Sequence, residues 1–272
     1  MRPDVLFSGS SAGSGGVRVL ADAFGASLRA TNVNCQMLGI CPLDFRAVID
    51  AGIGPDTDGK DYDTACGQAG WCDTACVAAG TCEYQDYMVG FGTEAHAGLW
   101  NARSEDSCPA WHADQANDPN TETWRCDDYG YLAVNHVTTP YFVRTDLQDE
   151  LLTKNYREAG FGFCPDFAAE VEGQHRALFD PVCPLDCSAA EGSVRTPGNP
   201  PLATPGVFAP QDTDHVGLTD RRPFFRVRLP CAAPPTNQCS FHDTLRNWFL
   251  GAGPQQLVAT YNPAGPAPSY CP

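Results

Sequence analysis

The sequence contains no long apolar run. No stretch approaches the roughly 20 consecutive apolar residues that a helix needs to cross a bilayer. No signal peptide is recognisable, because Met1 to Asp4 leads directly into a strand-like segment. Basic residues are also scarce, with 17 Lys and Arg against 33 Asp and Glu and a formal net charge of −16. Such a charge disfavours binding to nucleic acid and keeps a chain in solution. We therefore expect no membrane span and no nucleic-acid partner.

Cysteine, in contrast, is abundant, with 14 among 272 residues. An even number of this size fits up to seven disulfides formed in an oxidising compartment. Cys66, Cys72, Cys76 and Cys82 are separated by five, three and five residues, unlike the paired Cys-x-x-Cys blocks of structural zinc sites. We therefore expect a secreted or periplasmic monomer that is stabilised by disulfides and needs neither a metal nor an organic cofactor.

The most informative motif is a Gly- and Ser-rich segment that follows a strand-like run beginning at Val5. Gly9-Ser10-Ser11-Ala12-Gly13 has the pattern Gly-x-Ser-x-Gly, and apolar residues then recur at helical spacing over residues 17–24. Hydrolases place a serine nucleophile on a strained turn between strand and helix, where the residues two positions away on either side must be small. The pattern predicts Ser11 as a nucleophile, and a flexible loop without chemistry is the alternative.

The chain is expected to form a single α/β domain over residues 1–272, because 43% hydrophobic residues are enough to bury a sizeable core. Further strands are predicted over 45–50 and 141–149, and helices over 150–156, 165–178 and 244–250. We expect a Cys-rich insertion over about 55–126 and a Pro- and Cys-rich connection over about 179–240. The tail from Pro263 is expected to lack regular secondary structure and to be anchored by a disulfide of Cys271.

A serine nucleophile needs a base that accepts its proton, and the base needs an acid that fixes its tautomer. In α/β-hydrolases these residues follow in the chain order Ser, Asp, His. Asp149 is the expected acid because it follows a predicted strand, and Asp146, nearer the strand interior, is the alternative. His242 is the expected base, with His136 as the alternative. No partner is indicated for the remaining histidines, His96, His112, His175 and His215, which are expected to be surface or core residues.

Three short segments occur in this order: Gly9 to Gly16, Phe142 followed by Asp149, and Cys239-Ser240-Phe241-His242. Together they resemble the pectin acetylesterase family, with its nucleophile signature Gly-(Ser/Cys)-Ser-Ala-Gly-Gly, its strand ending in the catalytic Asp, and its Cys-x-x-His element. Ser14 stands where that family usually has Gly. The resemblance implies an α/β-hydrolase fold with Ser11 as nucleophile, Asp149 as orienting acid, and His242 as base and then acid.

The resemblance also implies an oxyanion hole formed by the backbone N–H of Ala12 and by a Gly-Gly-Gly loop that precedes the nucleophile strand. Only four residues precede Val5, and the sequence contains no such loop. We therefore expect either the carboxyl-terminal part of a longer enzyme, without the first strands of the fold, or a truncated gene product. Losing an oxyanion donor typically costs about a hundredfold or more in turnover, so weak activity is expected.

These patterns predict a serine carboxylesterase that works through an acyl-enzyme. The resemblance implies removal of acetyl groups from a polysaccharide such as pectin. A lipid ester, an acylated protein or a small aryl ester would use the same chemistry, and the shape of the pocket decides among them. The alternative of a different class is a secreted, disulfide-rich binding protein or an inactive, truncated hydrolase.

Overall fold

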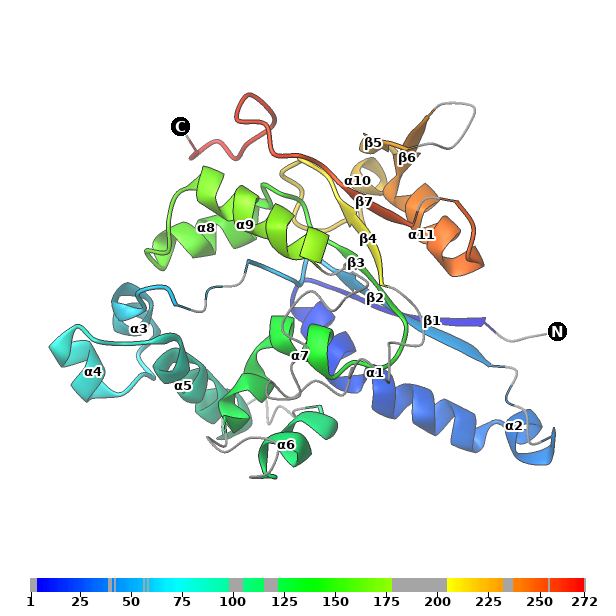
Figure 1. Ribbon diagram of the computed structural model, residues 1–272, viewed down its shortest axis with the longest axis horizontal. Helices are drawn as coiled ribbons and strands as arrows, with labels where there is room; N and C mark the ends of the chain where they lie inside the picture. Colours follow the sequence, from blue (N-terminus) through cyan, green and yellow to red (C-terminus); the bar gives the residue numbers. More distant parts are fainter. Residues whose placement is uncertain are drawn as a thin grey trace.

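The computed structural model of the chain describes residues 4–38, 41, 43–55, 57, 59–97, 105–114, 122–177, 205–231, 237–253 and 255–271. Within these residues, five strands form one parallel sheet (Figure 1). Their order across the sheet is β1 (Asp4–Ser10), β2 (Asp44–Asp50), β3 (Tyr141–Arg144), β4 (Gly206–Ala209) and β7 (Gln256–Val258). A separate antiparallel pair is formed by β5 (Arg228–Pro230) and β6 (Gln238–Ser240).

Helices connect the strands. They are α1 (Ala12–Thr31), α2 (Val33–Leu38), α3 (Asp63–Ala69), α4 (Thr74–Ala79), α5 (Tyr84–Ala97), α6 (Ser107–His112), α7 (Tyr129–Asn135), α8 (Glu150–Glu158), α9 (Cys164–Ala177), α10 (Arg221–Phe225) and α11 (Phe241–Leu250), with a 3-10 turn at Thr123–Asp127. In the described part of the chain, none of these helices has the length and apolar character needed to cross a membrane.

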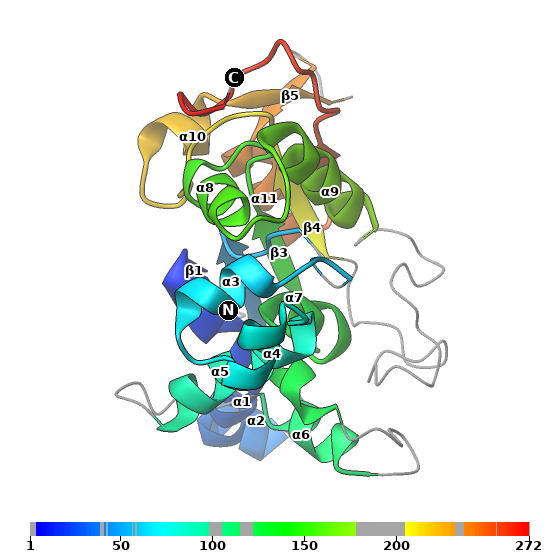
Figure 2. The same cartoon turned by 90° about the vertical axis from the view of Figure 1, so that its left-hand side faces the viewer.

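The central strands β3 and β4 are buried on both faces of the sheet, which explains why their sequences read as short apolar runs. Successive side chains of a strand point to opposite faces. Val143 and Val207 therefore pack with α1, α7 and α9, whereas Phe142 and Phe208 pack against α11 on the other face. Figure 2 shows the sheet edge-on with helices on both sides of it.

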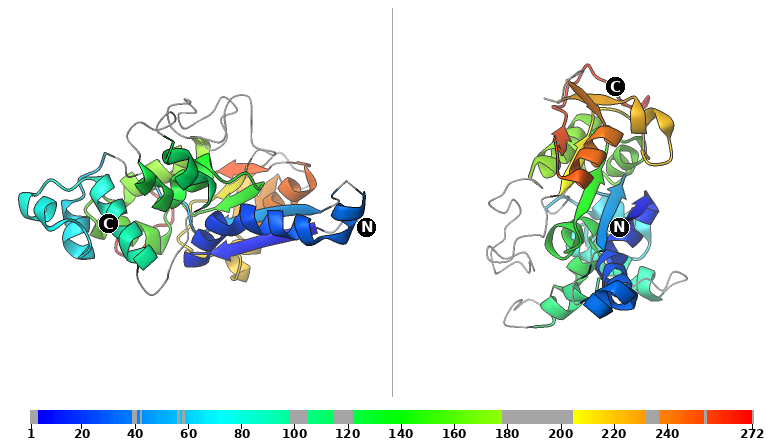
Figure 3. Two further views of the ribbon diagram at one scale, coloured as in Figure 1. Left: turned by 90° about the horizontal axis from the view of Figure 1, so that it is seen from below. Right: turned by 90° about the vertical axis from the view of Figure 1, so that its right-hand side faces the viewer.

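Disulfides cross-link the long connections, and this part of the sequence-based prediction is confirmed. The described pairs are Cys35–Cys41, Cys66–Cys72, Cys76–Cys82, Cys108–Cys126, Cys164–Cys271 and Cys231–Cys239. Cys183 and Cys187 lie outside the described residues. Helices α3 and α4 each contribute one cysteine to a disulfide, in Cys66–Cys72 and Cys76–Cys82. Together with α5 they lie beyond the carboxyl ends of β1 and β2, at the end of the molecule opposite α2 (Figures 1 and 3).

The strands and helices predicted near the amino terminus and the helices predicted at 150–156, 165–178 and 244–250 are confirmed. The strand predicted over 141–149 is wrong beyond Arg144, because the chain turns there and Leu147 donates its N–H to the carbonyl of Pro210 at 2.8 Å. Strand β4 was not predicted. Its four residues lie within the segment that sequence composition marked as a connection.

Candidate active site

Ser11 occupies the turn between β1 and α1, as predicted. Its backbone has φ 54° and ψ −126°, a region that residues other than glycine avoid. The Ser11 N–H donates to the carbonyl of Asp50 at 2.9 Å, and the Ser11 carbonyl accepts the N–H of Ser14 at 2.9 Å. Hydrogen bonds on both sides therefore hold the strained turn at the carboxyl edge of the sheet.

The two glycines of the motif have different roles. A Cβ atom on Gly9 would overlap with the backbone of Gly13 and would lie 2.9 Å from a methyl carbon of Val17. A Cβ atom on Gly13 would have no neighbour within 4 Å among the described residues. The expectation that both residues must be small is therefore right for Gly9 and wrong for Gly13, whose α-carbon faces open space.

The side chain that contacts Ser11 Oγ is His215, from the loop that follows β4. His215 Nε2 lies 2.7 Å from Ser11 Oγ, and Nδ1 lies 2.9 Å from each carboxylate oxygen of Asp149. Ser11 can donate its proton to Nε2 while the Nδ1–H donates to Asp149, which fixes the tautomer that a base requires. Parallel strands bring the turns after β1, β3 and β4 to one edge of the sheet, and this edge brings the three residues together.

Asp149 is held from two sides. It is the N-cap residue of α8, where its Oδ1 accepts the N–H of Leu152 at 2.9 Å. Burial raises the pKa of Asp149 above its ordinary value, and the hydrogen bond from His215 opposes this rise. The alternative acid, Asp146, lies 2.6 Å from Arg144 Nη2 instead. Of the two candidates, Asp149 is therefore the one that meets the histidine.

The structure does not bring His242 to Ser11. His242 lies at the start of α11, with Nδ1 3.3 Å from Asp243 and its ring beside Phe224 and Phe225. Within the described residues, no hydrogen bond joins His242 to Ser11 or Asp149. The Cys-x-x-His segment of His242 includes β6, which belongs to the separate antiparallel pair and is joined to the preceding loop by Cys231–Cys239.

The remaining histidines have other surroundings. His136 Nδ1 lies 3.1 Å from Ser107 Oγ, and His112 Nε2 lies 3.1 Å from the hydroxyl of Tyr131. His175 is buried, which lowers its pKa to about 4. The side chain of His96 lies outside the described part of the structure. A signal for His215 was present in the sequence, since the apolar run 206–209 precedes it and it also satisfies the order Ser, Asp, His.

Ala12, the expected oxyanion donor, is the first residue of α1. Its N–H belongs to the first turn of the helix, where N–H groups lack partners within the helix and favour negative charge. It directly follows Ser11 in the chain. This position is compatible with binding a developing oxyanion, and the role of Ala12 stays a prediction.

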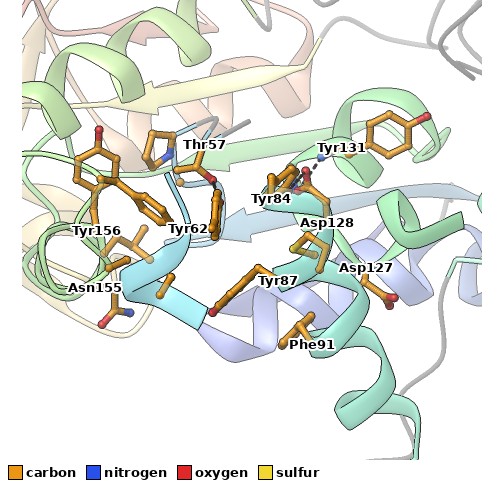
Figure 4. A pocket seen from close by; sticks show the side chains of 18 of the residues that line it. Thr57, Tyr62, Tyr84, Tyr87, Phe91, Asp127, Asp128, Tyr131, Asn155 and Tyr156 are labelled. Carbon is orange, nitrogen blue, oxygen red and sulfur yellow. Dashed lines mark hydrogen bonds between the residues drawn. The ribbon is translucent and has the colours of Figure 1, made fainter. Parts of the chain in front are cut away.

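A cavity of about 580 Å³ lies beside the site (Figure 4). Two of its lining residues connect it with the site: Gly52 packs against Ser14, and the N–H of Leu152 holds Asp149. Aromatic and polar residues make up much of the remaining wall, including Tyr62, Tyr84, Tyr87, Phe91, Asp127, Asp128, Asn155 and Tyr156. Ser11 and His215 are not among the described residues that line it, so the reacting groups lie next to the cavity rather than in its wall.

Groups of potential metal ligands in the described residues already have other partners. Two of the three groups include cysteines that form disulfides. The third group is formed by Asp146, Asp212 and Asp214. Arg144 pairs with the first of these carboxylates and Arg222 with the other two. The positive charges of Arg144 and Arg222 thus compensate the negative charges of this carboxylate cluster.

The chain has a fold of the α/β-hydrolase type, and Ser11, His215 and Asp149 lie in contact at the carboxyl edge of its sheet. The sequence matches no protein-family model, and no curated protein matches it. The structure is similar to that of the Wnt deacylase Notum from Drosophila, with a TM-score of 0.53 and 17% sequence identity. The similarity covers 99% of this chain and 60% of that chain. The fold implied by the resemblance to the pectin acetylesterase family is thereby confirmed.

Proposed function

We propose that this chain is a serine carboxylesterase with Ser11 as nucleophile, His215 as base and Asp149 as orienting acid. The observation that carries the proposal is the continuous chain of contacts from Ser11 Oγ to His215 at 2.7 Å and from His215 to Asp149 at 2.9 Å. The strained backbone of Ser11 and the similarity in fold to a deacylase support the same reaction class.

In the proposed reaction, His215 Nε2 accepts the proton of Ser11 as Oγ attacks the ester carbonyl carbon. The tetrahedral intermediate collapses as His215 returns this proton to the leaving alcohol, and an acyl-enzyme remains. Water then loses a proton to His215 while its oxygen attacks the acyl carbon, and Ser11 regains its proton as the carboxylic acid leaves. Asp149 keeps the Nδ1–H directed away from the serine, and the N–H of Ala12 donates to the oxyanion.

The proposed substrate is an acylated carbohydrate, with the acetyl ester of a polysaccharide as the first candidate. Aromatic faces such as those of Tyr87 and Phe91, with polar groups such as Asp127 and Asn155, are suited to contacting a sugar ring. The net charge of −16 disfavours a densely anionic polymer, so a neutral acetylated glycan is favoured over acetylated pectin. The disulfides support an oxidising, extracellular location.

Covalent labelling with a fluorophosphonate probe tests the proposed nucleophile and base. We expect the oxidised wild-type chain to be labelled, Ser11→Ala and His215→Ala to lose labelling, and His242→Ala to keep it. His242→Ala is a matched control, because it removes the histidine that the sequence indicated but that the structure places elsewhere. Labelling that survives in His215→Ala and disappears in His242→Ala would contradict the assigned base. A folded wild-type chain without labelling would instead favour a binding protein or an inactive hydrolase.

Hydrolysis of a panel of esters tests the proposed substrate. Acetylated neutral glycan, acetylated polygalacturonate, an acylated peptide, and aryl esters of short and long acyl chains would be compared by kcat/KM. We expect the neutral glycan to exceed the polygalacturonate. A preference for long acyl chains irrespective of the alcohol would contradict the carbohydrate proposal while leaving the triad in place.

A further inference from the structure

Arg144 lies at the carboxyl end of β3, and its buried side chain reaches the loop that carries His215. Its Nη1 donates to the carbonyl of His215 at 3.1 Å, and its Nη2 donates to the carbonyl of Asp214 at 3.0 Å. A guanidinium group can bind two neighbouring acceptors at once because its donors form a rigid planar fork. The peptide groups on either side of the His215 α-carbon are thus held by a residue that forms no described hydrogen bond with the imidazole.

Asp50 holds the same loop further along the chain, just after His215. Its buried carboxylate accepts the N–H of Gly217 at 2.8 Å and the N–H of Leu218 at 2.9 Å. The same oxygen accepts the hydroxyl proton of Ser10 at 2.6 Å, and the backbone carbonyl of Asp50 accepts the N–H of Ser11. A single residue at the end of β2 therefore holds both the nucleophile turn and the histidine loop.

Arg144 and Asp50 also contact each other, with Nη1 3.3 Å from Oδ1. The loop fits closely against this pair, since a Cβ atom on Gly217 would lie 3.0 Å from Arg144 Nε. Burying an ion pair often adds little to stability, because the desolvation of both charges offsets their attraction. Arg144 also pairs with the buried carboxyl group of Asp146 at 2.6 Å. Stability alone is nevertheless a poor explanation for hydrogen bonds from both Arg144 and Asp50 to the backbone of one loop.

We infer that Arg144 and Asp50 are positioning residues that hold the backbone on both sides of His215, so that its imidazole stays between Ser11 and Asp149. This inference rests on the proposed esterase function. A misplacement of about 1 Å in a reacting group can cost roughly a hundredfold in rate. Neither residue lines the described cavity, so their loss should lower kcat and leave KM nearly unchanged.

Conservative variants test the inference with small changes in side-chain size. Arg144→Lys keeps the positive charge but removes the planar fork that binds both carbonyls, and Asp50→Asn keeps the shape of the side chain. Arg46→Lys is a matched control, because Arg46 similarly binds the carbonyl of Trp248 and the carboxylate of Asp44, towards the amino end of β2. We expect kcat for an aryl acetate to fall about a hundredfold in Arg144→Lys, with KM within about twofold, and Arg46→Lys to retain the wild-type kcat.

The proton on His215 Nδ1 provides a second readout that does not depend on turnover. A proton shared by a histidine and a carboxylate gives a low-field NMR signal, which we expect in the wild type and in Arg46→Lys. The signal should broaden or disappear in Arg144→Lys and Asp50→Asn. If the wild type shows the signal but hydrolyses no ester, the proposed function fails, and the response of the signal in the variants still decides the positioning role.

Two results would overturn the inference. The first is a folded Arg144→Lys or Asp50→Asn protein with wild-type kcat and an unchanged Nδ1 proton signal. The second is an equal loss of kcat and signal in Arg46→Lys, which would show that any change in a strand arginine perturbs the site through the fold as a whole.

Discussion

Ser14 and Gly52 pack against each other with no room for another carbon atom, because a Cβ on Gly52 would overlap with the Ser14 side chain. The hydroxyl of Ser14 donates to the carbonyl of Ser11 at 2.5 Å, so this contact lies directly behind the proposed nucleophile. Ser14 stands where the nucleophile signature of the resembled family has Gly. The extra side chain is accommodated because the facing residue after β2 is a glycine.

We predict that Gly52→Ala destabilises the fold by about 1–3 kcal/mol, the usual range for an overpacked core. Adding Ser14→Gly should recover much of this loss, since it removes the atoms with which the new Cβ collides. Urea unfolding of both single variants and the double variant measures this coupling. Gly67→Ala, where a Cβ has no described neighbour within 4 Å, is the control. If the free energy of unfolding of the double variant equals the value expected by adding the effects of the two single substitutions, the contact between Ser14 and Gly52 would be contradicted.

The glycines at the nucleophile turn should respond differently to the same change. Gly9→Ala places a Cβ against the backbone of Gly13, and we expect a loss of about 1–3 kcal/mol together with slower fluorophosphonate labelling. Gly13→Ala meets no described atom and should leave the unfolding free energy within about 0.5 kcal/mol of the wild type. Equal destabilisation by the two variants would show that the turn has a different shape.

Ionisation of one buried carboxyl group, Asp146, should make the fold less stable as pH rises above the ordinary pKa of an aspartate. Burial raises the pKa of Asp146 well above its usual value of 3.8, and the nearby Arg144 opposes this rise. At pH values between the pKa of Asp146 in the unfolded chain and its pKa in the folded chain, the native state binds more protons than the unfolded state. The stabilisation that protonated Asp146 gives to the native state is therefore fully present below pH 3.8 and is lost as pH rises through the folded pKa.

Asp146→Asn tests this dependence, because the amide cannot ionise. We expect the free energy of unfolding of the variant to fall less steeply with pH than that of the wild type. Urea titrations at a series of pH values above 3.8 measure the two slopes. Asp214→Asn is a useful comparison, since the pKa of this more exposed carboxyl is also raised by burial. Parallel slopes for Asp146→Asn and the wild type would place the titrating group elsewhere.

Among the described disulfides, Cys164–Cys271 joins residues 107 positions apart, whereas Cys35–Cys41 spans six. Loop-closure entropy assigns about 4–5 kcal/mol to the longer link and about 2 kcal/mol to the shorter one. Replacing both cysteines by serine in each pair should therefore lower the thermal midpoint more for Cys164–Cys271. A larger effect from Cys35–Cys41 would mean that local strain or residual structure outweighs the entropy of the unfolded chain.

Several local elements followed from the sequence because short-range physics sets them. The Gly-x-Ser-x-Gly pattern between an apolar run and a helical repeat predicted the turn at Ser11, and the even number of cysteines predicted extensive disulfides. Asp149 was predicted from its place after a strand, although that strand ends five residues earlier than expected. The signals for Ser11 and Asp149 each lie within a window of a few residues, whereas the disulfide prediction rests on the number of cysteines in the whole chain.

Which histidine lies beside Ser11 depends on long-range contacts. The sequence by itself determined a serine turn, a nearby acid and several histidines in a suitable order. Only the tertiary structure showed that His215, and not His242, contacts Ser11 and Asp149, because β4 pairs with β3 and brings its following loop to Asp149, whereas β6 pairs with β5 in a separate sheet. Strands as short as four residues leave little periodic signal, and their positions are settled by their neighbours in the folded sheet.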